Sequence, residues 1–151
     1  MPVPSSFDYA VIRVVPRVER EEFINAGVIL FCRTRRFLGA RLALDWGRLA
    51  ALDAELNPVE VEEHLALIPL LCSGDPAAGP LAALPQADRF HWLVAPRSSV
   101  IQCSPVHTGL SADPRATLEH LLETIVCHPE SKTSQVGQNV ISNLVRGEKS
   151  P

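Results

Sequence analysis

Arg13 is the residue whose position points most clearly to chemistry, because it lies within an otherwise apolar stretch, residues 9–16. Arginine is rarely buried without a partner, and its guanidinium binds carboxylates and phosphates through paired hydrogen bonds. Asn25 has the strand parity to share a face with Arg13, and Glu22 lies at the mouth of the same strand. These three residues are candidates for binding an anionic ligand or a carboxylate of a partner protein. A structural ion pair at Arg13, or its exposure to solvent, is the simpler alternative.

A second group of polar residues surrounds a strand predicted near residue 100. It includes Arg97, Ser98 and His107, and His107 lies in a proline-bounded loop where it could act as an acid or a base. Roles in turns and caps are the simpler explanation for such residues. A nucleophilic pair lacks support, because the sequence has no G-x-S-x-G motif and no identifiable acidic residue to orient the histidine. We therefore assign no catalytic residue and treat these three as candidates for binding a ligand or partner.

The cysteines and histidines form no recognisable metal-binding pattern. Cys32, Cys72, Cys103 and Cys127 are far apart without a C-x-x-C pair, and the histidines lack H-E-x-x-H spacing. Buried free thiols in a reducing compartment are the simplest interpretation. The sequence also has no P-loop and no G-x-G-x-x-G motif, which disfavours a nucleotide-binding enzyme. We predict no metal and no cofactor.

Composition narrows the classes of function. The 151 residues carry a net charge of -3, so the chain as a whole has no electrostatic attraction to nucleic acid. Arg33, Arg35 and Arg36 form a basic hairpin tip, but the chain lacks the interleaved aromatic residues of a nucleic-acid-binding surface. The longest apolar run, residues 26–32, is too short to span a bilayer, and residues 1–6 do not resemble a signal peptide. We expect a cytoplasmic protein without a membrane segment, and nucleic acid is a disfavoured partner.

Hydrophobic patterns predict strands first and helices later in the chain. The expected strands are residues 7–15, 23–32, 37–44 and 98–104. Asn57-Pro58 and Asp113-Pro114 are helix start signals, because Asn and Asp cap helices and proline is favoured at the first helical position. They predict helices at residues 58–72 and 114–127, although Pro69 should kink the first of these or end it early.

These elements predict one α+β domain over residues 7–127. Its sheet should be mainly antiparallel, with about four strands and with helices packed on one face. Residues 105–112 are expected to form a turn-rich loop. Residues 128–151 read as a polar tail, in which residues 136–145 predict at most a marginal helix. An open sheet leaves two edges to be covered, which allows a homodimer through one of them.

Several sequence blocks resemble a known family. Residues 9–16 (Tyr-Ala-Val-Ile-Arg-Val-Val-Pro) and 20–30 (Arg-Glu-Glu-Phe-Ile-Asn-Ala-Gly-Val-Ile-Leu) are similar to the opening of a bacterial family, the domain-of-unknown-function family 3037. Residues 95–102 (Ala-Pro-Arg-Ser-Ser-Val-Ile-Gln) and 104–109 (Ser-Pro-Val-His-Thr-Gly) resemble it too, and the resemblance covers about residues 7–127. It implies no established activity. It suggests a kinase-like protein as a partner, because genes of this family often neighbour kinase-like genes.

The sequence supports two functional hypotheses. The first is a non-enzymatic protein-interaction module, because no catalytic constellation accompanies the compact α+β pattern. The alternative is an enzyme or ligand-binding domain that acts on an anionic small molecule or nucleic acid. Its site would consist of Arg13, Asn25, Arg97 and His107, which would then have to converge on one concave surface.

Overall fold

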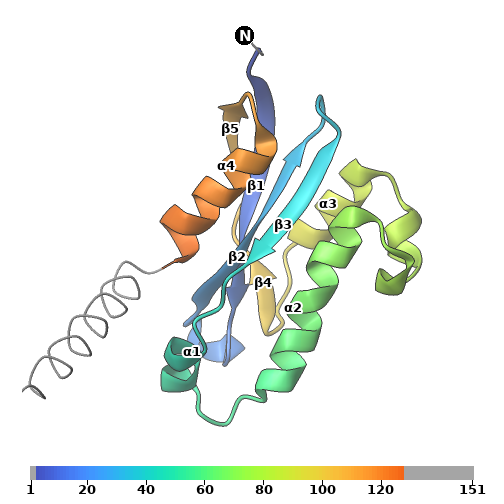
Figure 1. Ribbon diagram of the computed structural model, residues 1–151. Coiled ribbons are helices and arrows are strands. Elements are labelled where there is room, and N and C mark those ends of the chain that lie inside the picture. The colour runs from blue at the N-terminus through green and yellow to red at the C-terminus, as the bar shows by residue number, and fades with distance from the viewer. Residues whose placement is uncertain (1–2, 128–151) are drawn as a thin grey trace, which may run out of the picture.

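The computed structural model describes residues 3–127, and its sheet is built around the first strand. The five strands are β1 (Ser5–Val14), β2 (Ile24–Cys32), β3 (Phe37–Leu42), β4 (Ile101–Cys103) and β5 (His107–Ser111). β1 pairs with β2 along one edge and with both β4 and β5 along the other, and β3 pairs with the far edge of β2 (Figure 1). All of these pairs are antiparallel, which confirms the predicted α+β class and its mainly antiparallel sheet.

β5 corrects the prediction of a loop at residues 105–112 and makes the sheet five-stranded. This segment lacks the apolar alternation of a half-buried strand, since Leu110 is 75% exposed and His107 and Thr108 are also exposed. The strand forms because β1 offers it an unpaired edge. Gly109 permits the close pairing, because a Cβ at this position would lie 2.7 Å from Cζ of Phe7.

Helices cover both faces of the sheet, whereas the sequence predicted them on one face only. On one face, α2 (Pro58–Ser73) and α3 (Gln86–Val94) pack against a core that includes Ile12, Val14 and Ile29. On the other face, α4 (Pro114–Leu121) and a π-helical turn (Leu122–Val126) pack against Val28 and Leu30. Consecutive residues of a strand point to opposite faces, so the burial of every β2 residue except Asn25 requires a cover on both sides.

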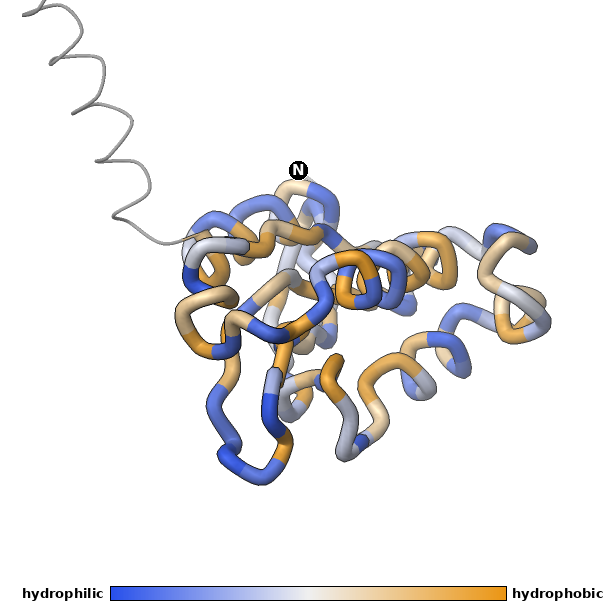
Figure 2. Tube along the Cα trace, turned by 90° about the horizontal axis from the view of Figure 1, so that it is seen from below, coloured by the Kyte–Doolittle hydropathy of each residue, from blue (hydrophilic) through white to orange (hydrophobic). Residues whose placement is uncertain are grey.

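The helix start signals work as predicted. Asn57 Oδ1 accepts a hydrogen bond from the Val59 amide at 3.0 Å, and Asp113 Oδ1 accepts one from the Ala116 amide at 3.3 Å. A short helix, α1 (Trp46–Leu52), is capped in the same way by Asp45. Helical turns of the chain carry both hydrophobic and hydrophilic residues (Figure 2), and the separation into one apolar and one polar face is clearer in α3 and α4 than in α2.

α2 runs through Pro69 to Ser73, which agrees with the predicted span of residues 58–72, so of the two effects expected of Pro69 the early end does not occur. A buried arginine holds the last turn. Arg89 is 8% exposed, and its Nη1 donates to the carbonyl oxygens of Leu71 and Cys72, both at 2.8 Å. Carbonyls in the last helical turn have no partner within the helix, so the guanidinium satisfies the Cys72 carbonyl. The Leu71 carbonyl also accepts a hydrogen bond from the Gly74 amide at 3.2 Å, so there the guanidinium is a second donor.

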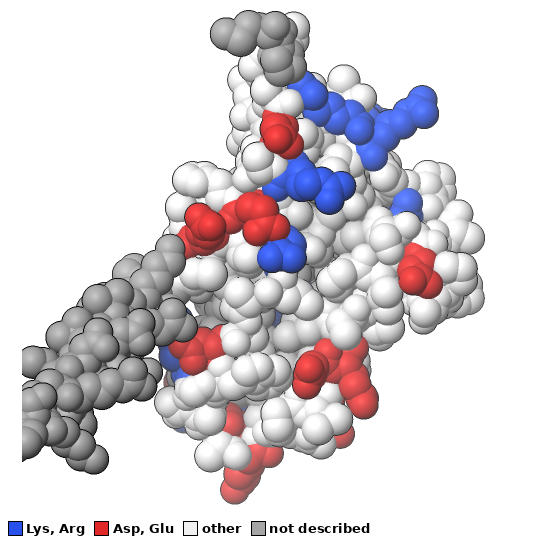
Figure 3. Space-filling view, in the orientation of Figure 1, with Lys and Arg blue, Asp and Glu red and all other residues white. Residues whose placement is uncertain are grey.

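The two ends of the molecule differ in charge. Basic side chains gather where the β2–β3 hairpin turns, whereas acidic side chains are more numerous at the end formed by α1 and the start of α2 (Figure 3). No helix among residues 3–127 is long and apolar enough to cross a membrane. The predicted polar tail, with its marginal helix at residues 136–145, lies outside the described residues.

Candidate functional site

An apolar groove of about 570 Å³ lies between α2, α3 and the segment that leads into β4. We call it the α2–β4 groove. Its lining includes Leu67, Ile68 and Leu71 of α2, Trp92 and Leu93 of α3, and residues 97–103. The volume falls within the range of about 300–1,000 Å³ that is typical of ligand pockets, and such pockets are mostly apolar with a few polar groups.

Two large apolar side chains of the groove remain exposed to solvent. Leu67 is 46% exposed and Trp92 is 43% exposed. Single exposed apolar residues are common, but apolar residues gathered around a hollow mark surfaces that bind another molecule. The lining also contains two basic residues, His64 and Arg97, and no carboxylate. The groove is therefore apolar along its walls and free of negative charge.

Arg97 is held at the groove by Trp92. Its guanidinium carbon lies 4.0 Å from the centre of the Trp92 ring, and its Nη2 donates a hydrogen bond to the Trp92 carbonyl oxygen. Stacking of this kind orients the guanidinium and leaves its other N–H groups available. Among residues 3–127 those N–H groups have no further acceptor and no ion-pair partner. The geometry of the Arg97 side chain is therefore compatible with the binding role that the sequence predicted for it.

The segment from Ser98 to β4 is shaped by its own polar side chains. Ser99 Oγ donates to the Ile101 carbonyl oxygen at 2.7 Å, and Gln102 Nε2 donates to the Ser99 carbonyl oxygen at 2.8 Å. Ser98 is exposed and lines the groove. These bonds support the role in local turns that the sequence suggested, and they position the chain for its short pairing with β1.

The thiols near the groove are unsuited to nucleophilic chemistry at neutral pH. Burial raises the pKa of Cys103 to about 11 and the pKa of Cys72 to about 12. Cys103 also donates a weak hydrogen bond from Sγ to the Leu93 carbonyl oxygen at 3.5 Å. Because the thiolate is the reactive form, both residues act here as small apolar groups of the core.

Arg13 and Asn25 lie on the opposite face of the sheet from the groove. They are direct partners across β1 and β2, as the strand parity predicted. Asn25 Nδ2 donates to the carbonyl oxygen of Ile125, in the π-helical turn, at 3.5 Å. The Arg13 guanidinium carbon lies 4.1 Å from the centre of the Phe23 ring. A smaller hollow of about 230 Å³ adjoins Asn25 and contains Arg48 at its wall.

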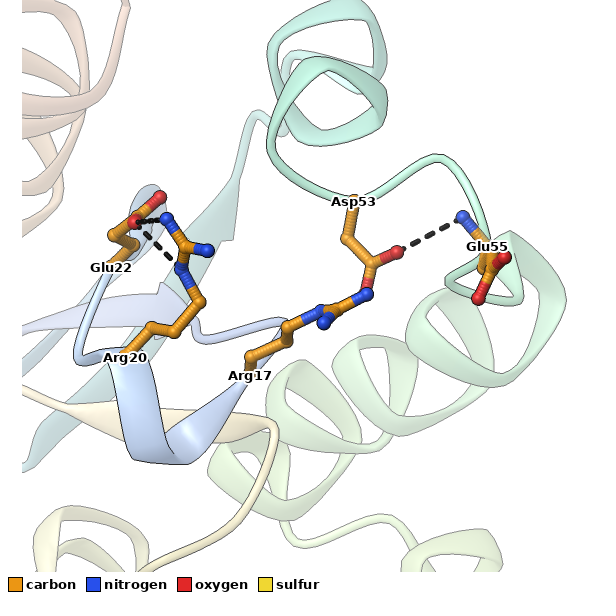
Figure 4. Close-up of polar contacts among 5 residues, drawn as sticks. All are labelled: Arg17, Arg20, Glu22, Asp53 and Glu55. Carbon is orange, nitrogen blue, oxygen red and sulfur yellow. Dashed lines mark hydrogen bonds and ion pairs between the residues drawn. The ribbon is translucent and has the colours of Figure 1, made fainter.

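Glu22, named with Arg13 and Asn25 as a candidate binding residue, forms no ion pair with Arg13. Glu22 Oε1 accepts hydrogen bonds from Nε and Nη2 of Arg20, at 2.9 Å and 2.6 Å (Figure 4). Both side chains are exposed. The neighbouring Arg17 contacts Asp53 at 3.6 Å, which ties the connector to the end of α1. The role of partner to Arg13 falls to the Phe23 ring instead.

His107 lies on β5, apart from both the groove and the Arg13–Asn25 pair. It is paired with Tyr9 across β1 and β5, and the centres of their rings are 5.2 Å apart. Arg13 is four residues further along β1, which corresponds to roughly 13 Å at about 3.3 Å per residue. The four residues of the alternative hypothesis therefore do not converge on one concave surface. Among residues 3–127, no three His, Cys, Asp or Glu side chains gather in a way that could hold a metal ion.

Comparison with known proteins decides the family. The sequence model of one family, described as "Protein of unknown function (DUF3037)", matches residues 9–126. The chain belongs to this family. No curated protein and no solved structure matches it. The match agrees with the blocks that suggested the resemblance, and it takes in every strand except the first residues of β1.

For this DUF3037 chain, sequence reasoning found part of the groove and missed the rest. Arg97 and Ser98 were identified, but Leu67 and Trp92 were not. Leu67 follows the buried residues Val61 and Leu65 in a helix that is apolar on more than one side, so periodicity does not distinguish it from the core. One available signal was the tryptophan five residues before Arg97, because a ring at that distance is within reach of a guanidinium.

Proposed function

We propose that this chain is a protein-interaction module that binds a segment of a partner protein in the α2–β4 groove. The observation that carries the proposal is the exposure of Leu67 and Trp92 at the rim of an otherwise apolar hollow. Tryptophan and arginine are the residues most often found as binding hot spots, and Trp92 and Arg97 are stacked here.

Burial of the exposed apolar surface supplies the driving force. Complete burial of a large apolar side chain is worth about 1.5–3 kcal/mol, and Leu67 and Trp92 each have almost half of their surface still to bury. Burial by a partner therefore provides only a few kcal/mol from these two residues. This amount suits a specific contact within a larger interface better than it suits a complete binding site.

The alternative of a site for an anionic ligand at Arg13, Asn25, Arg97 and His107 is not favoured. These residues belong to three separate surfaces, and the buried thiols of Cys72 and Cys103 are protonated at neutral pH. A non-enzymatic role accordingly has the better support.

The cellular setting is part of the proposal. We place the protein in the bacterial cytoplasm, where its four cysteines, all free thiols in the structure, would stay reduced. A kinase-like protein is the first partner to test. The gene neighbourhood suggested by the family resemblance is the reason for this choice.

Matched baits test the proposal. The parent chain, Leu67→Glu and Leu110→Glu are each used to capture proteins from a lysate of the source organism, and captured proteins are identified by mass spectrometry. Leu110 is the control, because it is also an exposed leucine but lies on β5 and outside the groove. The captured protein is then purified and titrated against all three chains.

We expect a purified partner to bind the parent and Leu110→Glu chains with equal affinity and to lose at least about tenfold in affinity for Leu67→Glu, because the added carboxylate would be buried. Equal affinity for all three chains would exclude the groove as the binding surface. If a small apolar metabolite from the lysate saturates the groove instead, the groove is a site for a small ligand and the proposal of a protein partner is wrong.

A further inference from the structure

Resting on the proposed function, we infer that the partner segment is extended, joins the sheet as an added strand along β4, and places a carboxylate on Arg97. The inference combines three observations about the groove: the direction of the β4 backbone groups, the path of the groove, and its charge.

The backbone hydrogen bonds of β4 show which groups face away from β1. The Val15 amide donates to the Val100 carbonyl at 2.6 Å, and the Ser104 amide donates to the Val11 carbonyl at 2.8 Å. Hydrogen-bonded pairs alternate along an antiparallel ladder, so Gln102 also turns its backbone groups toward β1. The backbone groups of Ile101 and Cys103 consequently point outward.

These outward groups form a short open edge. The Ile101 carbonyl oxygen already accepts a hydrogen bond from Ser99 Oγ. The remaining groups are the amide of Ile101 and both backbone groups of Cys103. Among residues 3–127, no strand pairs with this edge of β4. A peptide in extended conformation offers donors and acceptors at the matching spacing, which is the basis of strand addition.

The groove follows this same edge. Ile101, Gln102 and Cys103 all line it, although successive side chains of a strand point to opposite faces. Contact with three consecutive residues places the groove along the length of β4, where the outward backbone groups lie. An extended segment paired with β4 would direct every second side chain toward Leu67 and Trp92.

Charge complementarity specifies the chemistry of the segment. Arg97 stands at the groove with free N–H groups, His64 is the other basic residue of the lining, and no carboxylate is present. A guanidinium with free donors is matched by a carboxylate. The segment should therefore carry an apolar residue and, near it, an aspartate, a glutamate or its own C-terminal carboxylate. A helical segment satisfies its own backbone groups and would leave the β4 edge unused.

The test uses Trp92 as the reporter. The chain contains two tryptophans, Trp46 and Trp92, and Trp46 lies on α1 outside the groove. In the full chain with Trp46→Phe, the fluorescence of Trp92 reports occupation of the groove. Random peptides displayed with free C-termini are selected on this chain, and the enriched peptides are synthesised and titrated. Each is also made with a single N-methyl group at successive backbone positions.

We expect enriched peptides to combine apolar residues with a carboxylate, and Arg97→Gln to weaken their binding about tenfold. N-methylation should weaken binding about five- to tenfold at the position whose amide donates to the Cys103 carbonyl, and have little effect at the two adjacent positions, because their amides face away from β4. Binding to Leu110→Glu should be unchanged.

Four outcomes would overturn the inference. Insensitivity to N-methylation, with apolar residues spaced three and four apart, would indicate a helical segment and leave the proposed function intact. Unchanged affinity of the peptides for Arg97→Gln would show that no peptide carboxylate contacts Arg97. A parent chain that sediments as a dimer, and becomes a monomer with Leu67→Glu, would put a second copy of the chain in the groove. Enriched peptides that bind Leu67→Glu as well as the parent would exclude the groove, and with it the proposed function.

Discussion

Arg13 lies directly opposite Asn25 across the β1–β2 ladder, and each carries a buried polar atom without a hydrogen-bond partner among residues 3–127. These atoms are Arg13 Nε, a donor, and Asn25 Oδ1, an acceptor. The ladder changes register between Ile12 and Arg13, so Ala26 is an extra residue on β2 at this point. The guanidinium itself is stacked on Phe23, and it forms no ion pair among residues 3–127.

Two substitutions at Arg13 should separate the contribution of its apolar stem to stability from the contribution of its charge. Arg13→Met keeps the apolar stem on Phe23 and removes an unpaired donor, so we expect the free energy of unfolding to change by less than about 0.5 kcal/mol. Arg13→Ala also removes the packing and should cost about 1–2 kcal/mol. Urea unfolding measures both. A cost above about 2 kcal/mol for the methionine variant would reveal an ion pair at Arg13 after all.

Arg89 should be the arginine on which stability depends most. Arg89→Met leaves the carbonyl oxygens of Cys72 and Leu84 without the guanidinium donor and removes one of the two donors to Leu71. We expect a loss of about 2–4 kcal/mol in urea unfolding. Arg48→Met is the control, because Arg48 is exposed and should change stability by less than about 0.5 kcal/mol. Equal effects of the two substitutions would contradict the assigned role of the buried guanidinium.

Two glycine substitutions should act in opposite directions. Gly109→Ala places a Cβ 2.7 Å from Phe7 Cζ and should destabilise the protein by about 1–3 kcal/mol through overpacking of the β1–β5 pair. Gly47→Ala meets only Asp45 Oδ1 at 3.4 Å, within α1, and should stabilise the protein by up to about 1 kcal/mol. Thermal and urea unfolding measure whether each substitution lowers or raises the stability. Stabilisation by Gly109→Ala would mean that β5 does not pair with β1 as described.

The buried thiols should make the protein less stable in alkali. Burial raises the pKa of Cys103 and Cys72 from the ordinary 9.0 to about 11 and about 12, so the folded state favours the protonated thiol. The resulting stabilisation is fully present below about pH 9 and is lost as the pH rises toward the raised values. The difference in unfolding free energy between the parent and a Cys72→Ala, Cys103→Ala variant should shrink between about pH 8.5 and 11. A difference independent of pH would place the thiols in contact with water.

The sequence predicted the parts of the fold that are determined locally. The strand parity of Arg13 and Asn25 follows from alternation along β1 and β2, and the starts of α2 and α4 follow from Asn57 and Asp113. β5 escaped prediction because its residues lack apolar alternation and most of them are exposed. Its pairing depends on the free edge of β1, a partner about 100 residues earlier in the chain.

The groove could be predicted only in part for a related reason. Arg97 was recognisable as a candidate, but its stacking on Trp92 depends on where α3 ends and how the chain turns back toward β4. The last turn of α2 is likewise bonded to Arg89, which lies on a different helix. A local pattern contains no information about such a partner.

The pairing of β1 on both of its edges affects how long this strand stays exposed during synthesis. β2 emerges from the ribosome soon after β1 and can form a hairpin with it, whereas β4 and β5 follow only after residue 100. At about 5–20 residues per second, one edge of β1 waits several seconds for its strands. An unpaired edge is a template for pairing with another chain. β1 is therefore the strand through which nascent chains of this protein would cross-pair, and slow translation of residues 33–100 would lengthen that exposure.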